Sequence, residues 1–144
     1  MSNDVKTFNL DLHAAATAQT IINNINKAGA KPQDAENLIT KALGVLQENG
    51  VYACALFLYA RTMDRAIAEK VRDGLLQITS ELGLSPPNNP DWKAGLKFVT
   101  DQICNDLDRL LLVRQLWEQT LIYARYGAKA WGVPKDKKES GEKQ

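Results

Sequence analysis

The sequence has few of the residues from which metal centres and most active sites are built. It contains one histidine, His13, and two cysteines, Cys54 and Cys104. These three are too few and too widely spaced for a common zinc site. It has no P-loop and no GxGxxG motif, the two short signatures of phosphate and dinucleotide binding. We therefore expect a non-catalytic chain that needs no metal ion and no cofactor.

Long apolar runs are also missing. The longest, Val51–Ala60 (VYACALFLYA), is about half of what a bilayer-spanning helix needs. The first residues, MSNDVKTFNLDL, are polar and lack the apolar core of a signal peptide. Both features predict a cytoplasmic protein that does not contact a membrane. In that compartment Cys54 and Cys104, each in an apolar helical context, are expected to be buried free thiols.

An excess of charge of one sign is the third absence. Lysine and arginine number 18 and the acidic residues 17, so the net charge is only +1. The overall charge therefore does not indicate a nucleic-acid partner, and any such partner has to meet a local patch. With 144 residues, 44% of them hydrophobic, the chain has the size and composition of one globular domain.

Apolar residues recur at helical spacing through most of the chain, which predicts an all-α single domain of five or six helices over residues 1–134. Within it, residues 1–9 are predicted to form a loose arm, and the polar segment 135–144 a disordered tail. The 51–60 segment, apolar on nearly every side, is predicted to be a central, enclosed helix. The first helix is expected to be capped by Asp11 and to end near residue 27, and the second to open at Asp34 and end at 49. The third is expected to span 51–60, and the fourth to run from 62 or 64 to 82. After the loop 85–90, a fifth helix is expected to start at Asp91, and the last helix is expected to span 106–131.

The final helix, 106–131, has about seven turns and is apolar on two sides. A core-facing stripe is predicted for Leu107, Leu110, Trp117, Leu121, Ala124, Ala128 and Trp131. Leu112, Leu116 and Tyr123 project to the opposite side. This second side is expected to face either a neighbouring helix of the same chain or another subunit.

One edge of the same helix is basic. Arg114, Arg125 and Lys129 lie close together beside the apolar stripe, and no acidic residue occurs between positions 119 and 131. Cations near the end of a helix are favoured by its dipole, which is one explanation for Arg125 and Lys129. Arg114 lies far from that end, so the dipole does not explain it, and a surface that contacts phosphates is the other interpretation of the three residues.

A second basic group lies in the middle of the chain. Arg65 and Arg72 are seven residues apart and share a helix face, which Arg61 joins if the helix is continuous. Guanidinium groups bind phosphates with two parallel hydrogen bonds. Because acidic residues are interspersed, an ordinary solvated face is the alternative. Four aromatic residues also have two possible roles, base stacking or core packing. These residues are Trp92, Tyr123, Tyr126 and Trp131.

Two segments together resemble a known family. One is 39–61, ITKALGVLQENGVYACALFLYAR, and the other ends the last helix, LIYARYGAKAW. They are similar to the small all-helical subunit of type III-B (Cmr-type) CRISPR–Cas effector complexes, with the type III-A small subunit as the related alternative. The resemblance covers roughly residues 17–131. The matching residues are Lys41, Asn49, Gly50, 56–58, Tyr123, Ala124, Arg125 and Lys129.

The resemblance implies a specific role. Such subunits have no enzymatic activity, and several copies stack head to tail as an inner filament beside the backbone subunits and the large subunit. The filament contacts guide RNA and target RNA in antiviral defence. By position, the resemblance makes Lys41, Arg125 and Lys129 the first candidates for RNA contact, and the charge pattern adds Arg61, Arg65, Arg72 and Arg114. The alternative is a helical protein–protein adaptor that uses its apolar second side and contacts no nucleic acid.

Overall fold

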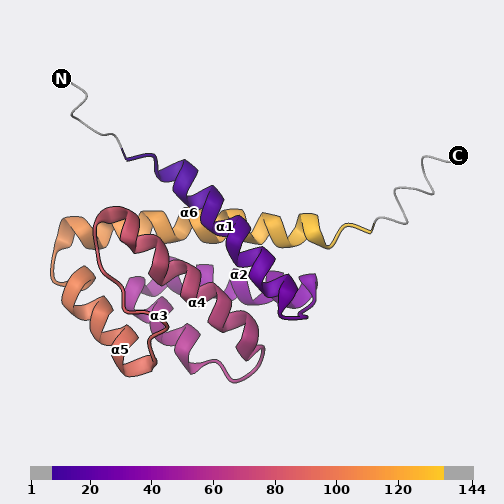
Figure 1. Cartoon of the computed structure of the whole chain (residues 1–144), viewed down its shortest axis with the longest axis horizontal. Helices are drawn as coiled ribbons and strands as arrows, with labels where there is room; N and C mark the ends of the chain where they lie inside the picture. Colours follow the sequence, from indigo (N-terminus) through magenta and orange to yellow (C-terminus); the bar gives the residue numbers. More distant parts are fainter. Residues whose placement is uncertain (1–7, 135–144) are drawn as a thin grey trace, which may run out of the picture.

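The computed structural model describes residues 8–134, which form six α-helices and no β-strand (Figure 1). The predicted all-α fold is confirmed. A short 3-10 turn, η2 (Thr79–Leu82), extends the fourth helix, and a π-helical segment, η3 (Val99–Cys104), extends the fifth. The predicted tail and the first seven residues of the predicted arm lie outside the described residues. The α-helices are α1 (Leu10–Lys27), α2 (Pro32–Asn49), α3 (Val51–Ala60), α4 (Arg65–Ile78), α5 (Trp92–Phe98) and α6 (Leu107–Trp131).

The first two helices begin earlier than predicted. Asn9, and not Asp11, caps α1: its side-chain oxygen accepts the backbone N–H of Leu12 at 3.0 Å. Pro32, and not Asp34, opens α2. Proline suits a first helical position because its ring fixes φ and because the N–H it lacks has no partner within the helix there. The part of the predicted arm that is described is therefore ordered, and it includes a cap.

The fourth helix begins later than the earliest predicted start. Asp64 adopts a left-handed conformation with φ 55°, and α4 starts at Arg65 directly after it. Arg61 follows the last residue of α3 and has an extended backbone. The helix is therefore not continuous from Arg61 to Arg65, and Arg61 does not share a helix face with Arg65 and Arg72. The predicted cap at Asp91 is confirmed, since its side chain accepts the N–H of Ala94 at 2.8 Å. Asp106, predicted to be the first residue of the last helix, is instead its cap and accepts the N–H of Arg109 at 3.0 Å.

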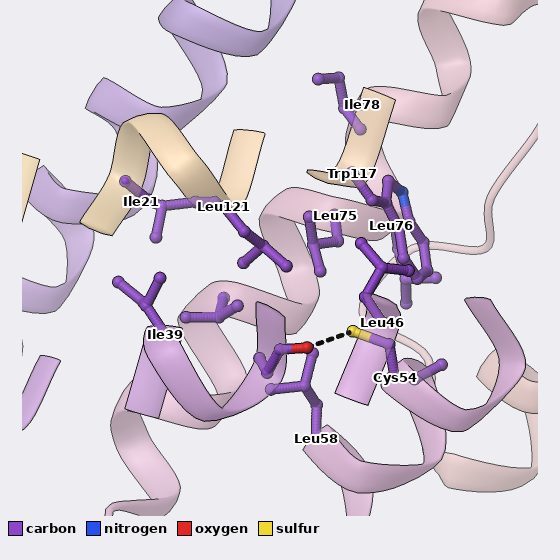
Figure 2. Close-up of a cluster of buried hydrophobic side chains, with 14 of the residues drawn as sticks. Ile21, Ile39, Leu46, Cys54, Leu58, Leu75, Leu76, Ile78, Trp117 and Leu121 are labelled. Atoms are coloured by element: carbon purple, nitrogen blue, oxygen red, sulfur yellow. Dashed lines mark hydrogen bonds between the residues drawn. The ribbon is translucent and has the colours of Figure 1, made fainter. Parts of the chain in front are cut away.

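The long helix α6 packs against both α1 and α2, and α4 lies beside α1 (Figure 1). The core fills the space between these helices and α3. Trp117 and Leu121 of α6 are its centre and are about 1% exposed or less. Figure 2 shows them gathered with side chains from the other helices: Ile21 of α1, Ile39 and Leu46 of α2, Leu58 of α3, and Leu75 and Leu76 of α4.

The burial pattern of α6 corrects part of the prediction. Leu107, assigned to the core stripe, is 68% exposed. Leu116, assigned to the second apolar side, is fully buried within the chain, in line with the alternative in which that side faces a helix of the same chain. Because α6 is covered by α1 on one side and α2 on another, its buried arc is wide in the middle. Near its first turn α6 contacts η3, where Arg109 donates to the backbone carbonyl of Gln102 at 2.8 Å, and the Leu107 side chain stays exposed beside this contact. Trp117, Leu121, Ala124 and Ala128 do form the predicted stripe.

The helix α3 is less enclosed than its apolar sequence predicts. Leu56 is 45% exposed and Tyr52 39% exposed, so one side of α3 faces outward. The opposite side holds Cys54, whose thiol donates to the carbonyl oxygen of Ala42 at 3.7 Å (Figure 2). Both Cys54 and the half-buried Cys104 are free thiols, as predicted. No helix in the described part of the chain is both long enough and apolar enough to cross a bilayer.

Candidate nucleic-acid interface

The predicted RNA-contact residues fall into two groups. The first lies where α2 and α6 run antiparallel, and we call this line the α2–α6 seam. Lys129 pairs with Glu36 at 3.3 Å, and Arg125 donates from Nε to the Thr40 hydroxyl at 3.1 Å. Farther along, Arg114 donates to the backbone carbonyl of Gln47 at 2.8 Å. The seam thus contains Arg114, Arg125 and Lys129, in line along one helix.

These contacts differ in what they do to charge. The carboxylate of Glu36 offsets the charge of Lys129. Arg125 and Arg114 are held by neutral oxygens, and within residues 8–134 neither makes a salt bridge. A guanidinium has five N–H donors, so each arginine is positioned by one hydrogen bond and keeps other donors for a ligand. The arginines of the seam are fixed without being neutralised.

Lys41 lies next to the seam. It follows Thr40 on α2 and is exposed, and consecutive helical residues point about 100° apart. Its side chain therefore does not join the line of contacts between α2 and α6. Within the described residues its ammonium makes no salt bridge. Lys41 therefore adds positive charge close to Arg125, because its neighbour Thr40 is bound to Arg125. It makes none of the contacts that join α2 to α6 in the seam.

The second group is a pocket of about 200 Å³ between α3, α4 and the start of α5. We call it the arginine pocket. Arg61 reaches it from the end of α3, and Arg65 and Arg72 reach it from α4. The predicted grouping of these arginines is thus met by the fold although Arg61 is not on α4. The pocket is lined by Leu58, Tyr59, Arg61, Arg65, Glu69, Arg72, Pro90, Asp91 and Trp92.

Arg72 is the most enclosed of these arginines. Its side chain is 13% exposed, and its guanidinium carbon lies 4.2 Å from the centre of the Tyr59 ring. The nearest carboxylate oxygen, on Asp73, is 3.7 Å away. Its buried Nε has no hydrogen-bond partner, and the same holds for Nε of Arg61. A buried donor without a partner is costly. Because these Nε atoms are enclosed by the protein, only the terminal nitrogens of the two guanidiniums can meet a ligand.

Two carboxylates also line the pocket. Glu69 pairs with Arg65 at 3.6 Å, and both groups are largely solvated. Asp91 uses one oxygen as the cap of α5, where it accepts the N–H of Ala94. Arg65 is paired with Glu69, and Arg72 has Asp73 at 3.7 Å just outside the lining. Within residues 8–134, Arg61 makes no salt bridge. The pocket is suited to an anionic group that meets Arg61 and Arg72.

Tyr59 forms one wall and is fixed in place. Its hydroxyl donates to the carbonyl oxygen of Pro90 at 3.1 Å. Burial raises the pKa of the Tyr59 hydroxyl above its ordinary value, and the nearby Arg72 opposes that rise. The hydroxyl therefore remains a donor at neutral pH. Gly95 allows this arrangement, because a Cβ at that position would overlap the Tyr59 hydroxyl.

The aromatic candidates divide by exposure. Trp92 is 57% and Tyr126 is 59% exposed, so both have faces available for stacking. Trp131 packs against the core and is half-buried. Tyr123 is also half-buried and donates a hydrogen bond to Asp11. Sequence reasoning missed Tyr59 as a neighbour of the arginines, because only the fold brings the end of α3 beside the start of α5.

Comparison with known proteins adds no identification. The chain matches no protein-family model, no curated protein sequence and no solved structure. Within residues 8–134 no cluster of three or more histidine, cysteine or acidic side chains is placed to hold a metal ion. The two basic groups, the α2–α6 seam and the arginine pocket, are therefore the features on which a function can be proposed.

Proposed function

We propose that the chain is a non-catalytic small subunit of a type III CRISPR effector complex, of the type III-B (Cmr) kind, that contacts guide and target RNA. The observation that carries the proposal is the pair of seam arginines, Arg114 and Arg125, held by neutral oxygens. Eleven residues of helix separate them, which is about 16 Å. Two fixed cations at that distance, neither in a salt bridge within residues 8–134, suit contact with separate phosphates of one strand.

The resemblance supplies the rest of the proposal. Lys41, Arg125 and Lys129 are the positions that match the family, and they lie on or beside the seam. One modest patch on a nearly neutral subunit is enough when copies stack head to tail, because repeated weak contacts along one strand multiply. A head-to-tail interface that does not close continues as an open filament. The isolated subunit is then expected to bind RNA weakly.

Copurification from the native host tests the proposal directly. Tagged chain should recover guide RNA together with backbone and large subunits of the effector. Recovery of neither guide RNA nor a backbone subunit would sink the proposal. In the assembled complex, the double substitution Arg125→Glu and Lys129→Glu should weaken target-RNA binding at fixed salt. The fold should survive, because both side chains lie at the surface of the seam and an ion pair such as Lys129–Glu36 contributes little.

A helical protein–protein adaptor is the alternative, and one observation favours it. Leu107 and Leu111, one turn apart at the start of α6, are 68% and 54% exposed. Exposed apolar side chains on adjacent turns suit contact with another protein. Under this alternative the same copurification returns protein partners without RNA, and the seam substitutions leave their recovery unchanged.

A further inference from the structure

The arginine pocket does not stand alone. A second pocket, of about 210 Å³, adjoins it and is lined by Leu56, Tyr59, Ala60, Trp92 and Leu96. Tyr59 and Trp92 belong to both linings, so these two rings form the partition between a basic chamber and an apolar one. Leu56 and Trp92 are 45% and 57% exposed, which leaves the apolar chamber open to solvent.

We infer that an unpaired RNA nucleotide binds across this partition, with its phosphate at Arg61 and Arg72 and its base against Trp92 in the apolar chamber. The inference rests on the proposed function, because it takes the polymer to be the RNA of that proposal. It assigns this part of the chain a task separate from the α2–α6 seam. There the contacts go to phosphates alone, whereas here the base is bound as well.

The basic chamber fits a phosphate. Within residues 8–134 neither the Arg61 nor the Arg72 guanidinium donates a hydrogen bond, and only the Nε atom of each is fully buried without a partner, so the terminal nitrogens remain for a ligand. Arg72 is held against the Tyr59 ring, and Arg61 lies with its guanidinium carbon 5.4 Å from the centre of the Phe57 ring. Ring faces orient a guanidinium without supplying an acceptor. The acceptor is therefore left for the ligand, and a phosphate offers several oxygens.

The apolar chamber fits a base. Single-stranded nucleic acid is bound by aromatic side chains on which the bases stack, next to cations that meet the backbone. Trp92 supplies the aromatic face, and Leu56 and Ala60 supply apolar surface from α3. In one nucleotide a single sugar joins the phosphate to the base. The two groups are therefore close enough to occupy the two adjoining chambers, which only the Tyr59 and Trp92 rings separate. Helical RNA keeps its bases paired and stacked, so only an unpaired nucleotide can enter.

The two chambers are pre-formed on rigid elements. Tyr59 is tied to Pro90, Asp91 caps α5 and so fixes the helix that begins with Trp92, and Gly95 lets α5 approach Tyr59. A site whose walls are already fixed loses little conformational freedom on binding. A short acidic peptide with one apolar side chain is the competing occupant, and competition with oligoglutamate distinguishes it from RNA.

The test is a titration of the full chain followed by NMR, which detects weak binding. Each of the three tryptophans gives a separate indole N–H signal, assigned with Trp→Phe variants. The probe is a single-stranded oligouridylate of about ten nucleotides. We expect the Trp92 signal to shift and the signal of Trp117, which is buried, to stay in place. Trp92→Ala should weaken oligouridylate binding about tenfold, as removal of one stacking platform does.

Matched probes and variants make the result decisive. Arg72→Gln should weaken binding similarly, and Lys27→Gln, which removes an exposed cation on α1 that lines neither chamber, should not. An abasic strand should be insensitive to Trp92→Ala, and an RNA duplex should leave the Trp92 signal unmoved. A Trp92 signal unmoved by millimolar oligouridylate would overturn the inference, and so would displacement of the oligonucleotide by oligoglutamate at equal concentration.

The two proposals fail separately. If oligouridylate or assembled RNA affects only α2–α6 seam residues, the nucleotide site is wrong and the RNA-contacting function stands. If the native complex contains no RNA while Trp92 still responds to oligouridylate, the type III effector assignment is wrong and the nucleotide site stands. Because Trp92 is exposed, its alanine variant is expected to fold, and a thermal melt of each variant checks this.

Discussion

The guanidinium of Arg72 lies over the ring of Tyr59, 4.2 Å from its centre, while the Tyr59 hydroxyl is bound to the Pro90 carbonyl. One aromatic side chain thereby connects α4 through α3 to the loop that precedes α5. The guanidinium of Arg72 lies on a ring face, and its ion pair with Asp73 is long, at 3.7 Å. The same contact both stabilises the domain and keeps an arginine available to an anion.

Removing the Tyr59 hydroxyl should weaken this connection. Tyr59→Phe keeps the ring under Arg72 and removes the hydrogen bond to Pro90, which should lower the free energy of unfolding by about 1 kcal/mol. Urea denaturation measures it. Tyr52→Phe is the matched control, because Tyr52 is on the same helix, is partly exposed and makes no side-chain hydrogen bond within residues 8–134. An equal decrease in both variants would contradict the role given to the Tyr59 hydroxyl.

Two glycines in helices should respond oppositely to alanine. A Cβ at Gly95 would overlap Tyr59, whereas a Cβ at Gly44 in α2 would meet nothing within 4 Å. Gly95→Ala should therefore destabilise the chain by about 1–3 kcal/mol through overpacking. Gly44→Ala should stabilise it by about 0.5–1 kcal/mol, since alanine loses less backbone entropy in a helix. Thermal melts compare the two, and a stable Gly95→Ala variant would show that α5 can shift away.

The seam arginines should control the salt dependence of RNA binding. Replacing Arg114 or Arg125 with glutamine in the assembled complex should reduce the slope of log affinity against log salt by about one unit for each phosphate that the variant no longer binds. Lys129→Gln should have a smaller effect, because Glu36 already pairs with that cation. Lys97→Gln is the control, since Lys97 is bound to Asp101 at 2.8 Å. An unchanged slope in both arginine variants would remove the seam from the interface.

The two thiols should differ in reactivity. Burial raises the pKa of Cys54 from 9.0 to about 12, so the folded chain keeps it protonated through the neutral and mildly alkaline range. Burial also raises the pKa of Cys104, which is only half-buried. Because the thiolate is the nucleophile, iodoacetamide at pH 8 should modify Cys104 first and Cys54 only on unfolding. Mass spectrometry over time reads this out, with urea-unfolded chain as the control.

The same shift gives a pH dependence of stability. Unfolded Cys54 loses its proton near pH 9, and the folded thiol loses it near pH 12, so stability from this group is complete below pH 9 and falls between pH 9 and 12. Cys54→Ala should flatten that part of the profile. Urea denaturation of the unsubstituted chain and of Cys54→Ala at pH 8 and pH 10.5 measures the difference in the free energy of unfolding. An equal decrease in both proteins would contradict the role given to Cys54.

Much of the fold follows from the sequence, and the failures have local causes. Helical periodicity located the helices other than α3, whose apolar sequence fits a buried strand equally well and was assigned from its helical neighbours. Asp91 was predicted as a cap because a carboxylate stands directly before an apolar helical pattern. Asn9 was missed because Asp11 offers the same chemistry two residues on. Leu107 was assigned to the core although it is exposed, because helical spacing gives the direction of a side chain and not whether another element covers it.

The candidate site was predictable only in part. The seam residues lie at helical spacing on one helix, so the sequence could group Arg114, Arg125 and Lys129, but their partners come from α2 and required the fold. Arg61 was grouped with Arg65 and Arg72 for a reason that the structure contradicts. They share a pocket because α3, α4 and the start of α5 meet there. The spacing of residues within one helix does not predict which helices meet.

The position of α6 in the chain has a consequence for biosynthesis. Thr40 and Arg125 are 85 residues apart, and Asp11 and Tyr123 are 112 apart. During translation, α1 and α2 therefore leave the ribosome on the order of ten seconds before the helix that covers them. For that interval their apolar faces are open to chaperones and to aggregation. A substitution that slows the docking of α6 would thus reduce the yield of soluble chain more than it reduces the stability of the folded product.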